Sequence, residues 1–150
     1  DLATLQWCHE LWTSDDTDPI DRVRIQWGAS HLLPAGVLGA HVTRWGQKPL
    51  GFACAVAMSG RFGFDLDLAS LTDDELAVCR EASAAYELIR PLVQQGDHHR
   101  LASPVGSDRA AVAFRDPGSG ASVVFLYRLE DGDSDAARLP IEIPPMPTAG

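Results

Sequence analysis

The chain has 150 residues, of which 45% are hydrophobic, and a formal net charge of −9 at pH 7. This length suits one ordinary domain, whereas a complete (β/α)8 barrel needs about 250 residues. The acidic balance argues against nucleic acid and anionic membranes as partners, and no apolar run approaches the ~20 residues of a membrane span.

The segment Trp12–Pro19 carries three carboxylates within four residues, behind an aromatic residue and two hydroxyls. A short strand is predicted at Leu11–Thr13, where this segment begins. Asp18, Pro19 and Asp21 suit the N-cap, the first and the third positions of a helix. Carboxylates between a strand end and a helix start are typical of the catalytic edge of a βα-barrel enzyme.

Strand and helix patterns alternate over residues 11–95. The predicted elements after the first strand are a helix at Pro19–Leu33 with Ile20, Val23, Trp27 and Leu32 on one face, a strand at Val37–Thr43, a helix at Leu50–Ser59, a strand at Phe62–Asp67, and a helix that begins with a capping box at Thr72–Glu75. Pro91 should end or kink the last helix. The alternation predicts a parallel α/β sheet.

After Gly96 the pattern changes to short strands separated by turn-forming residues. The strand candidates are Arg100–Ala102, Ala110–Phe114 and Ser122–Leu129, which together predict an antiparallel β-module. The proline-rich tail, Pro140 to Gly150, is expected to be an edge strand followed by disorder. We therefore expect one part at residues 1–96 and a second at residues 97–150.

The cysteines are Cys8, Cys54 and Cys79, which are odd in number, far apart and without a Cys-x-x-Cys pair. This usage predicts buried, reduced thiols in a cytoplasmic protein. No signal peptide is visible from Asp1 onward, although residues ahead of it could carry one. The histidines and cysteines have no metal-ligand spacing, so we expect no metal and no other cofactor.

The three carboxylates have a structural and a chemical interpretation. Acidic residues at a helix start cap it and suit its dipole. One cap is enough, however, and if Asp18 supplies it, Asp15 lies outside the helix at the end of the strand. Shielding by Trp12 would favour the protonated form of Asp15, which a general acid needs in order to protonate a glycosidic oxygen. His41 ends the next strand, where it could point into the same site or form a structural hydrogen bond.

Residues 12–18 resemble the acid/base motif of glycoside hydrolase family 36, the bacterial α-galactosidases, whose usual form is Trp-Thr-Ser-Asp-Asn-Thr-Asp. Asp16 stands where the family usually has Asn. Further stretches agree in order and spacing from residue 1 to about residue 128. They are Arg22 with Ile25-Gln26-Trp27-Gly28, Gly39–Thr43, Val56–Gly60, Gly63–Asp67, Tyr86, Ile89-Arg90, Arg100-Leu101 and Ser103-Pro104.

The resemblance implies the last three β/α units of a (β/α)8 barrel, followed by an antiparallel, β-sandwich-like module. It implies a retaining α-galactosidase that removes terminal α-linked galactose from oligosaccharides such as melibiose or raffinose. Asp15 would be the general acid/base, while the aspartate nucleophile would lie outside this chain. Trp12, Asp16 and His41 would contact the substrate. Family members are often tetramers, so the complete enzyme would be a homo-oligomer, and this chain alone would be incomplete and inactive.

Two other functions stay open at this point. The first is an α-N-acetylgalactosaminidase of the same mechanism, because the choice at the 2-position of the sugar lies partly in strands that this sequence does not contain. The second is a truncated module that binds sugar, or serves a structural purpose, without turnover.

Overall fold

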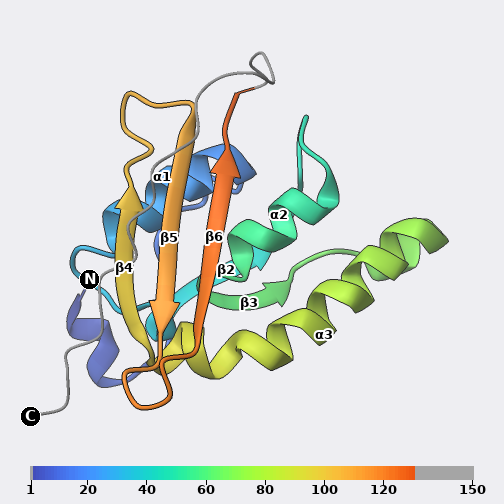
Figure 1. Cartoon of the computed structure of the whole chain (residues 1–150). Helices are drawn as coiled ribbons and strands as arrows, with labels where there is room; N and C mark the ends of the chain where they lie inside the picture. The colour runs from blue at the N-terminus through green and yellow to red at the C-terminus, as the bar shows by residue number, and fades with distance from the viewer. Residues whose placement is uncertain (1, 131–150) are drawn as a thin grey trace, which may run out of the picture.

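The computed structural model describes residues 2–130 and contains two three-stranded sheets (Figure 1). A 3-10 helix at Leu2–Gln6 precedes the elements expected from the sequence. The elements that follow are β1 (Leu11–Trp12), α1 (Pro19–Ala29), β2 (Leu38–Val42), α2 (Leu50–Ala57), β3 (Arg61–Phe64), α3 (Asp73–Gln95), β4 (Asp97–Ala102), β5 (Arg109–Arg115) and β6 (Ser122–Arg128), with short 3-10 turns at Ala35–Val37 and Leu68–Ser70. The expected edge strand in the tail lies outside the described residues.

The first sheet has the order β1-β2-β3, and both strand pairs are parallel. This confirms the predicted alternation of strand and helix over residues 11–95. In β2, Ala40 and Val42 are buried against apolar residues of α2 and α3. Their neighbours Gly39 and His41 therefore lie on the opposite face of the sheet, since side chains alternate along a strand. Because the strands are parallel, the segments that follow them meet at one edge.

The helix start predicted at Leu50 is confirmed, as are the two predicted from capping residues. The side chain of Asp18 accepts a hydrogen bond from the backbone N–H of Ile20 at 3.0 Å, and Pro19 is the first residue of α1. Thr72 and Glu75 form a reciprocal capping box at the start of α3. In α1 and α3 the side-chain oxygen satisfies an N–H group that has no partner within the helix.

The predicted end of α1 is wrong, and the predicted end of α2 at Ser59 is two residues too late, since α2 ends at Ala57. α1 ends at Ala29 rather than Leu33, because the N–H groups of His31 and Leu32 bond three residues back, to Gly28 and Ala29, and the chain tightens into turns. Leu32, which was placed on the apolar face of the helix, is 78% exposed. For Pro91 the sequence predicted either an end or a kink of the helix, and the first alternative is wrong, because α3 continues to Gln95.

The continuation of α3 beyond Pro91 follows from packing. Ile89, Leu92 and Val93 join the apolar cluster beneath the second sheet. Burying these side chains offsets the hydrogen bond that the proline cannot donate.

The second sheet has the order β4-β5-β6 and is antiparallel throughout, as predicted. Figure 1 shows its three long strands side by side, with helices packed against one face. Residues from α1, α2 and α3 share one core with β5 and β6. The division of the chain into domains at residues 1–96 and 97–150 stays a prediction, although α3 ends and β4 begins at that point.

The cysteine prediction is confirmed in part. Cys54 and Cys79 are buried and unbonded, whereas Cys8 is exposed, because it follows the surface 3-10 helix. Burial raises the pKa of the Cys54 thiol to about 12, with a smaller contribution from nearby Cys79. Within residues 2–130, no helix is long and apolar enough to cross a membrane.

Candidate active site

The acidic segment links the end of β1 to the start of α1, and its three carboxylates have different surroundings. Asp18 caps α1. Asp16 accepts a hydrogen bond from the backbone N–H of Asp18 at 3.0 Å, and its Oδ1 lies 3.3 Å from Nη2 of the Arg44 guanidinium. The carboxylate of Asp15 is exposed and has no hydrogen bond or ion pair with any residue between 2 and 130. Asp15 is thus the one of the three carboxylates with both oxygens free of partners among residues 2–130.

Arg44 connects this segment to the next strand, because it follows β2 at the same edge of the sheet. A groove of about 360 Å3 lies beside it, between the segments that follow β2 and β3. Trp45, Leu66 and Leu71 give the groove an apolar wall, and Asp67 and Ser70 add polar groups. The candidate site therefore has open space next to the acidic segment.

Trp12 and His41 lie together on the face of the sheet turned away from α2. Their ring centroids are 5.6 Å apart, with the ring planes at 43°. The expected shielding of Asp15 is not formed by this chain, because Asp15 is exposed and the Trp12 ring packs against His41 and the guanidinium of Arg22. The structure thus brings Trp12 and His41 into contact and leaves Asp15 open at the end of the strand.

His41 is oriented by residues that the sequence did not single out. Its Nε2 lies 3.3 Å from Oε1 of Glu10, whose other oxygen lies 2.9 Å from Nε of Arg61. Gly63, beside His41 in the sheet, leaves room for the ring, since a Cβ there would lie 2.8 Å from Cδ2 of His41. Glu10 could have been suspected from its position two residues before Trp12, which places both side chains on one face of an extended segment.

Asp65 follows β3 at the same edge of the sheet and is exposed. Its backbone N–H donates to the carbonyl of Val42 at 2.9 Å and so extends the pairing of β2 with β3. Among residues 2–130, no group of three or more His, Cys, Asp or Glu side chains could hold a metal ion.

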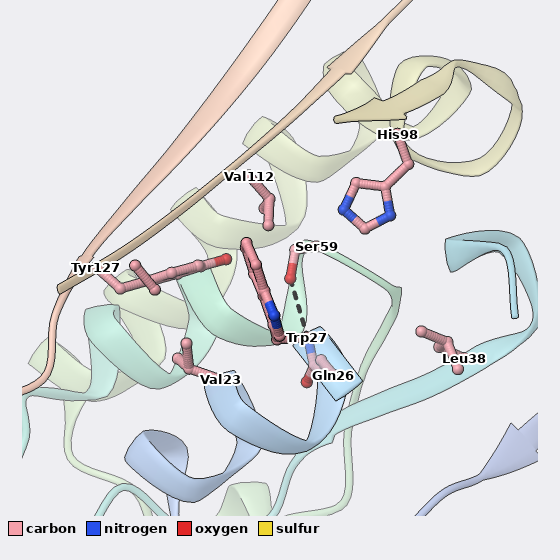
Figure 2. A pocket seen from close by; sticks show the side chains of 9 residues that line it. Val23, Gln26, Trp27, Leu38, Ser59, His98, Val112 and Tyr127 are labelled. Atoms are coloured by element: carbon pink, nitrogen blue, oxygen red, sulfur yellow. Dashed lines mark hydrogen bonds between the residues drawn. The ribbon is translucent and has the colours of Figure 1, made fainter. Parts of the chain in front are cut away.

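A much smaller cavity lies between α1, β2 and the antiparallel sheet (Figure 2). Its volume is about 20 Å3, roughly the room that one water molecule needs. The wall is mainly apolar, and Gln26 within it donates to the hydroxyl of Ser59 at 3.0 Å. No residue of the acidic segment lines this cavity, so it belongs to the packing of the two sheets and not to the candidate site.

His98 on β4 also faces this cavity and stacks on Phe114, with ring centroids 4.4 Å apart. Burial lowers its pKa to about 4, and the positive charge of Arg100 adds to the effect. The imidazole is therefore neutral at pH 7.

Comparison with known proteins places these features in a family. A family model described as Melibiase matches residues 1–96. Alpha-galactosidase AgaA of Geobacillus stearothermophilus is 35% identical over 135 residues, a match that covers 86% of this chain and 18% of AgaA. The crystal structure of the GH36 alpha-galactosidase AgaB from the same species superposes with a TM-score of 0.89 at 32% identity, covering 98% of this chain and 21% of AgaB.

A crystal structure of an AgaA variant in complex with raffinose superposes with a TM-score of 0.71 at 34% identity, covering 77% of this chain and 17% of that chain. This chain thus spans about a fifth of the length of the relatives that it matches.

Proposed function

The chain belongs to the melibiase family of GH36 α-galactosidases, and we propose that it carries the general acid/base of a retaining α-galactosidase, namely Asp15. Its three β/α units are part of a (β/α)8 barrel, and the antiparallel sheet follows them, as the sequence predicted. The whole activity would need the remaining strands of the barrel, among them the one that carries the aspartate nucleophile.

One observation carries the assignment to Asp15. Of the three neighbouring carboxylates, Asp18 is used by the helix and Asp16 by the turn and Arg44, while Asp15 has no partner in residues 2–130. It lies at the carboxyl edge of the parallel sheet, where barrel enzymes place their catalytic groups. Its match to the family's acid/base motif supports the same residue.

The chemistry of a retaining glycosidase then assigns two steps to Asp15. In the first, its carboxyl proton passes to the glycosidic oxygen as the bond from that oxygen to the anomeric carbon breaks and the nucleophile bonds to the carbon. In the second, the carboxylate takes a proton from water, and the oxygen of that water displaces the nucleophile. Galactose leaves with its α configuration retained.

The substrate that we propose is an oligosaccharide with a terminal α-linked galactose, of the melibiose or raffinose type. The raffinose complex of the AgaA variant supports this class. Trp12 and His41 would contact the sugar from the face of the sheet that is turned away from α2, where their rings pack together. Asp16 would do so through Oδ2, because its Oδ1 is already held by Arg44 and by the N–H of Asp18. The complete protein would be a cytoplasmic homo-oligomer.

The test uses a chimera in which this chain replaces the segment of Geobacillus AgaA that it matches. We expect Asp15→Ala to lower kcat/KM for melibiose by about 10²- to 10⁴-fold, the usual contribution of general acid catalysis. An aryl α-galactoside with an activated leaving group, such as the 2,4-dinitrophenyl derivative, needs little protonation and should lose far less.

Asp18→Ala is the matched control in the same segment. It should lower stability without changing the ratio between the two substrates. If Asp18→Ala abolishes melibiose hydrolysis and Asp15→Ala does not, the assignment is wrong. If neither variant changes turnover, the segment has no part in catalysis.

A further inference from the structure

We propose that Arg22 is a positioning residue for the acid/base segment, which it holds through the peptide group that carries Asp15. This inference rests on the proposed role of Asp15. Arg22 lies in the first turn of α1, and its backbone N–H donates to the carbonyl of Asp18 at 2.8 Å. Its side chain is only 4% exposed, which is unusual for a charged group.

The guanidinium of Arg22 joins three parts of the site. Its Nη1 donates to the carbonyl of Ser14 at 3.2 Å, and its Nη2 donates to the carbonyl of Gly39 in β2 at 3.0 Å. Its central carbon lies 4.9 Å from the centroid of the Trp12 ring. One side chain from α1 therefore contacts the end of β1, the acidic segment and the neighbouring strand.

The contact with Ser14 bears directly on Asp15. The carbonyl of Ser14 and the N–H of Asp15 belong to the same planar peptide group. A hydrogen bond to that carbonyl therefore fixes the orientation from which the Asp15 side chain leaves the backbone. The other terminal nitrogen of the guanidinium, Nη2, donates to the carbonyl of Gly39 and so ties this peptide group to β2, the central strand of the sheet.

The environment of Arg22 favours positioning over simple stabilisation. Burial lowers the pKa of the guanidinium, and the negative charge of Asp16 acts in the opposite direction. A desolvated charge is costly, and apolar residues of similar size often fill such a position with equal or better stability. What an apolar residue cannot supply is a planar fork that reaches two carbonyl oxygens while lying over an indole ring.

The catalytic consequence is specific. A general acid has to come within about 2.6–3.2 Å of the oxygen that it protonates, and a misplacement of about 1 Å can cost on the order of 10²-fold in rate. A loosened Asp15 would therefore slow the hydrolysis of substrates whose leaving group needs a proton. It would spare the cleavage of substrates whose leaving group departs as a stable anion.

The experiment compares Arg22→Lys with Arg24→Lys in the AgaA chimera. Arg24 lies on the same helix, but its guanidinium is half-exposed and, among residues 2–130, pairs only with Asp21, at 3.0 Å. We expect Arg22→Lys to lower kcat/KM for melibiose by about 10- to 100-fold and kcat/KM for the dinitrophenyl galactoside by less than about threefold, because a shorter side chain with a point charge lacks the planar fork that fixes the geometry of both hydrogen bonds. Arg24→Lys should change neither value.

An equal loss on both substrates would overturn the inference, since it would give Arg22 a merely structural role. Unchanged kinetics would overturn it as well. Should Arg22→Lys fail to fold, Arg22→Gln replaces it in the same comparison, since glutamine keeps an NH2 donor without the buried charge.

Asp15→Ala is measured in parallel. If Asp15→Ala shows the contrast between substrates and the Arg22 variant does not, only the inference fails, whereas a missing contrast in Asp15→Ala rejects the proposed function itself.

Discussion

Nε2 of His41 lies 3.3 Å from Oε1 of Glu10, on the face of the parallel sheet that is turned away from α2. Glu10 lies just before β1 and His41 lies in β2. The Glu10 carboxylate extends over Gly39 of β2, where a Cβ would lie 2.6 Å from Oε1. Glu10 also pairs with Arg61 at the start of β3, so one carboxylate connects all three strands. This arrangement orients a histidine that the proposed mechanism places against the sugar.

We expect the contributions of Glu10 and His41 to substrate binding to be coupled. In the AgaA chimera, Glu10→Gln and His41→Ala should each raise KM for melibiose, and the double variant should raise it by less than the product of the single effects. Contacting residues commonly show interaction energies of about 0.5–3 kcal/mol in such cycles. Independent effects would mean that Glu10 does not act through His41.

The glycine beside His41 gives a second prediction. A Cβ at Gly63 would lie 2.8 Å from the His41 ring, so Gly63→Ala should turn the ring and raise KM in the same way as His41→Ala. Gly51→Ala is the matched control, because nothing lies within 4 Å of a Cβ there and the residue is in α2. That control should leave KM unchanged and add about 0.5–1 kcal/mol of stability. Normal substrate binding by Gly63→Ala would contradict the predicted position of His41 in the site.

The helix cap gives a third prediction. Asp18→Ala removes the hydrogen bond to the N–H of Ile20 and should cost about 1 kcal/mol of stability. Asp18→Ser, which keeps a capping oxygen, should recover most of that loss. Thermal unfolding of the AgaA chimera and its two variants would measure the difference. Equal loss in both variants would show that Asp18 has a function other than capping.

His98 gives a prediction about pH. Its pKa in the folded protein, about 4, lies below the ordinary value of 6.5, so the unfolded chain takes up the proton first as the pH falls. Stability should therefore decrease progressively between pH 6.5 and about pH 4 and level off below that range, by about 2 kcal/mol once the partial exposure of the ring is allowed for.

The measurement is the unfolding midpoint of the chimera and its variants from pH 7 to pH 4. His98→Phe keeps the stack on Phe114 without the titrating group and should lose part of this pH dependence. His99→Gln, the neighbouring residue on β4, is the control. The charged and titratable groups that act on His98 are Arg100, His99 and His31. An identical pH profile in the parent chimera and in His98→Phe would show that the ring is not buried as a neutral group.

The sequence predicted those features that depend on local chemistry. Asp18 and Pro19 located the start of α1, and Thr72 and Glu75 located the start of α3, because capping involves residues only two or three positions apart. The helix ends depended on tertiary contacts. Pro91 stays within a helix because residues on both sides of it are buried beneath a sheet that forms later in the chain.

The same distinction applies to the site. Trp12, Asp15 and Asp16 could be proposed from the sequence because they stand together in one motif. Glu10 and Arg61 are 51 positions apart, and the pairing of the three strands brings Arg61 to the carboxylate that contacts His41. Arg22 was recognised as part of a family motif, but the two carbonyls that it binds belong to segments whose proximity the sequence does not encode locally.

The most direct test of the account is the product formed by Asp15→Ala in the presence of azide. If Asp15 is the acid/base, an activated aryl α-galactoside still forms the glycosyl-enzyme, and azide enters the space left by the carboxylate on the face opposite the nucleophile. Turnover of the Asp15→Ala chimera should then rise with azide concentration and yield α-galactosyl azide, with the configuration retained. β-Galactosyl azide would place Asp15 on the nucleophile side, and no rescue at any azide concentration would contradict its role as the acid/base.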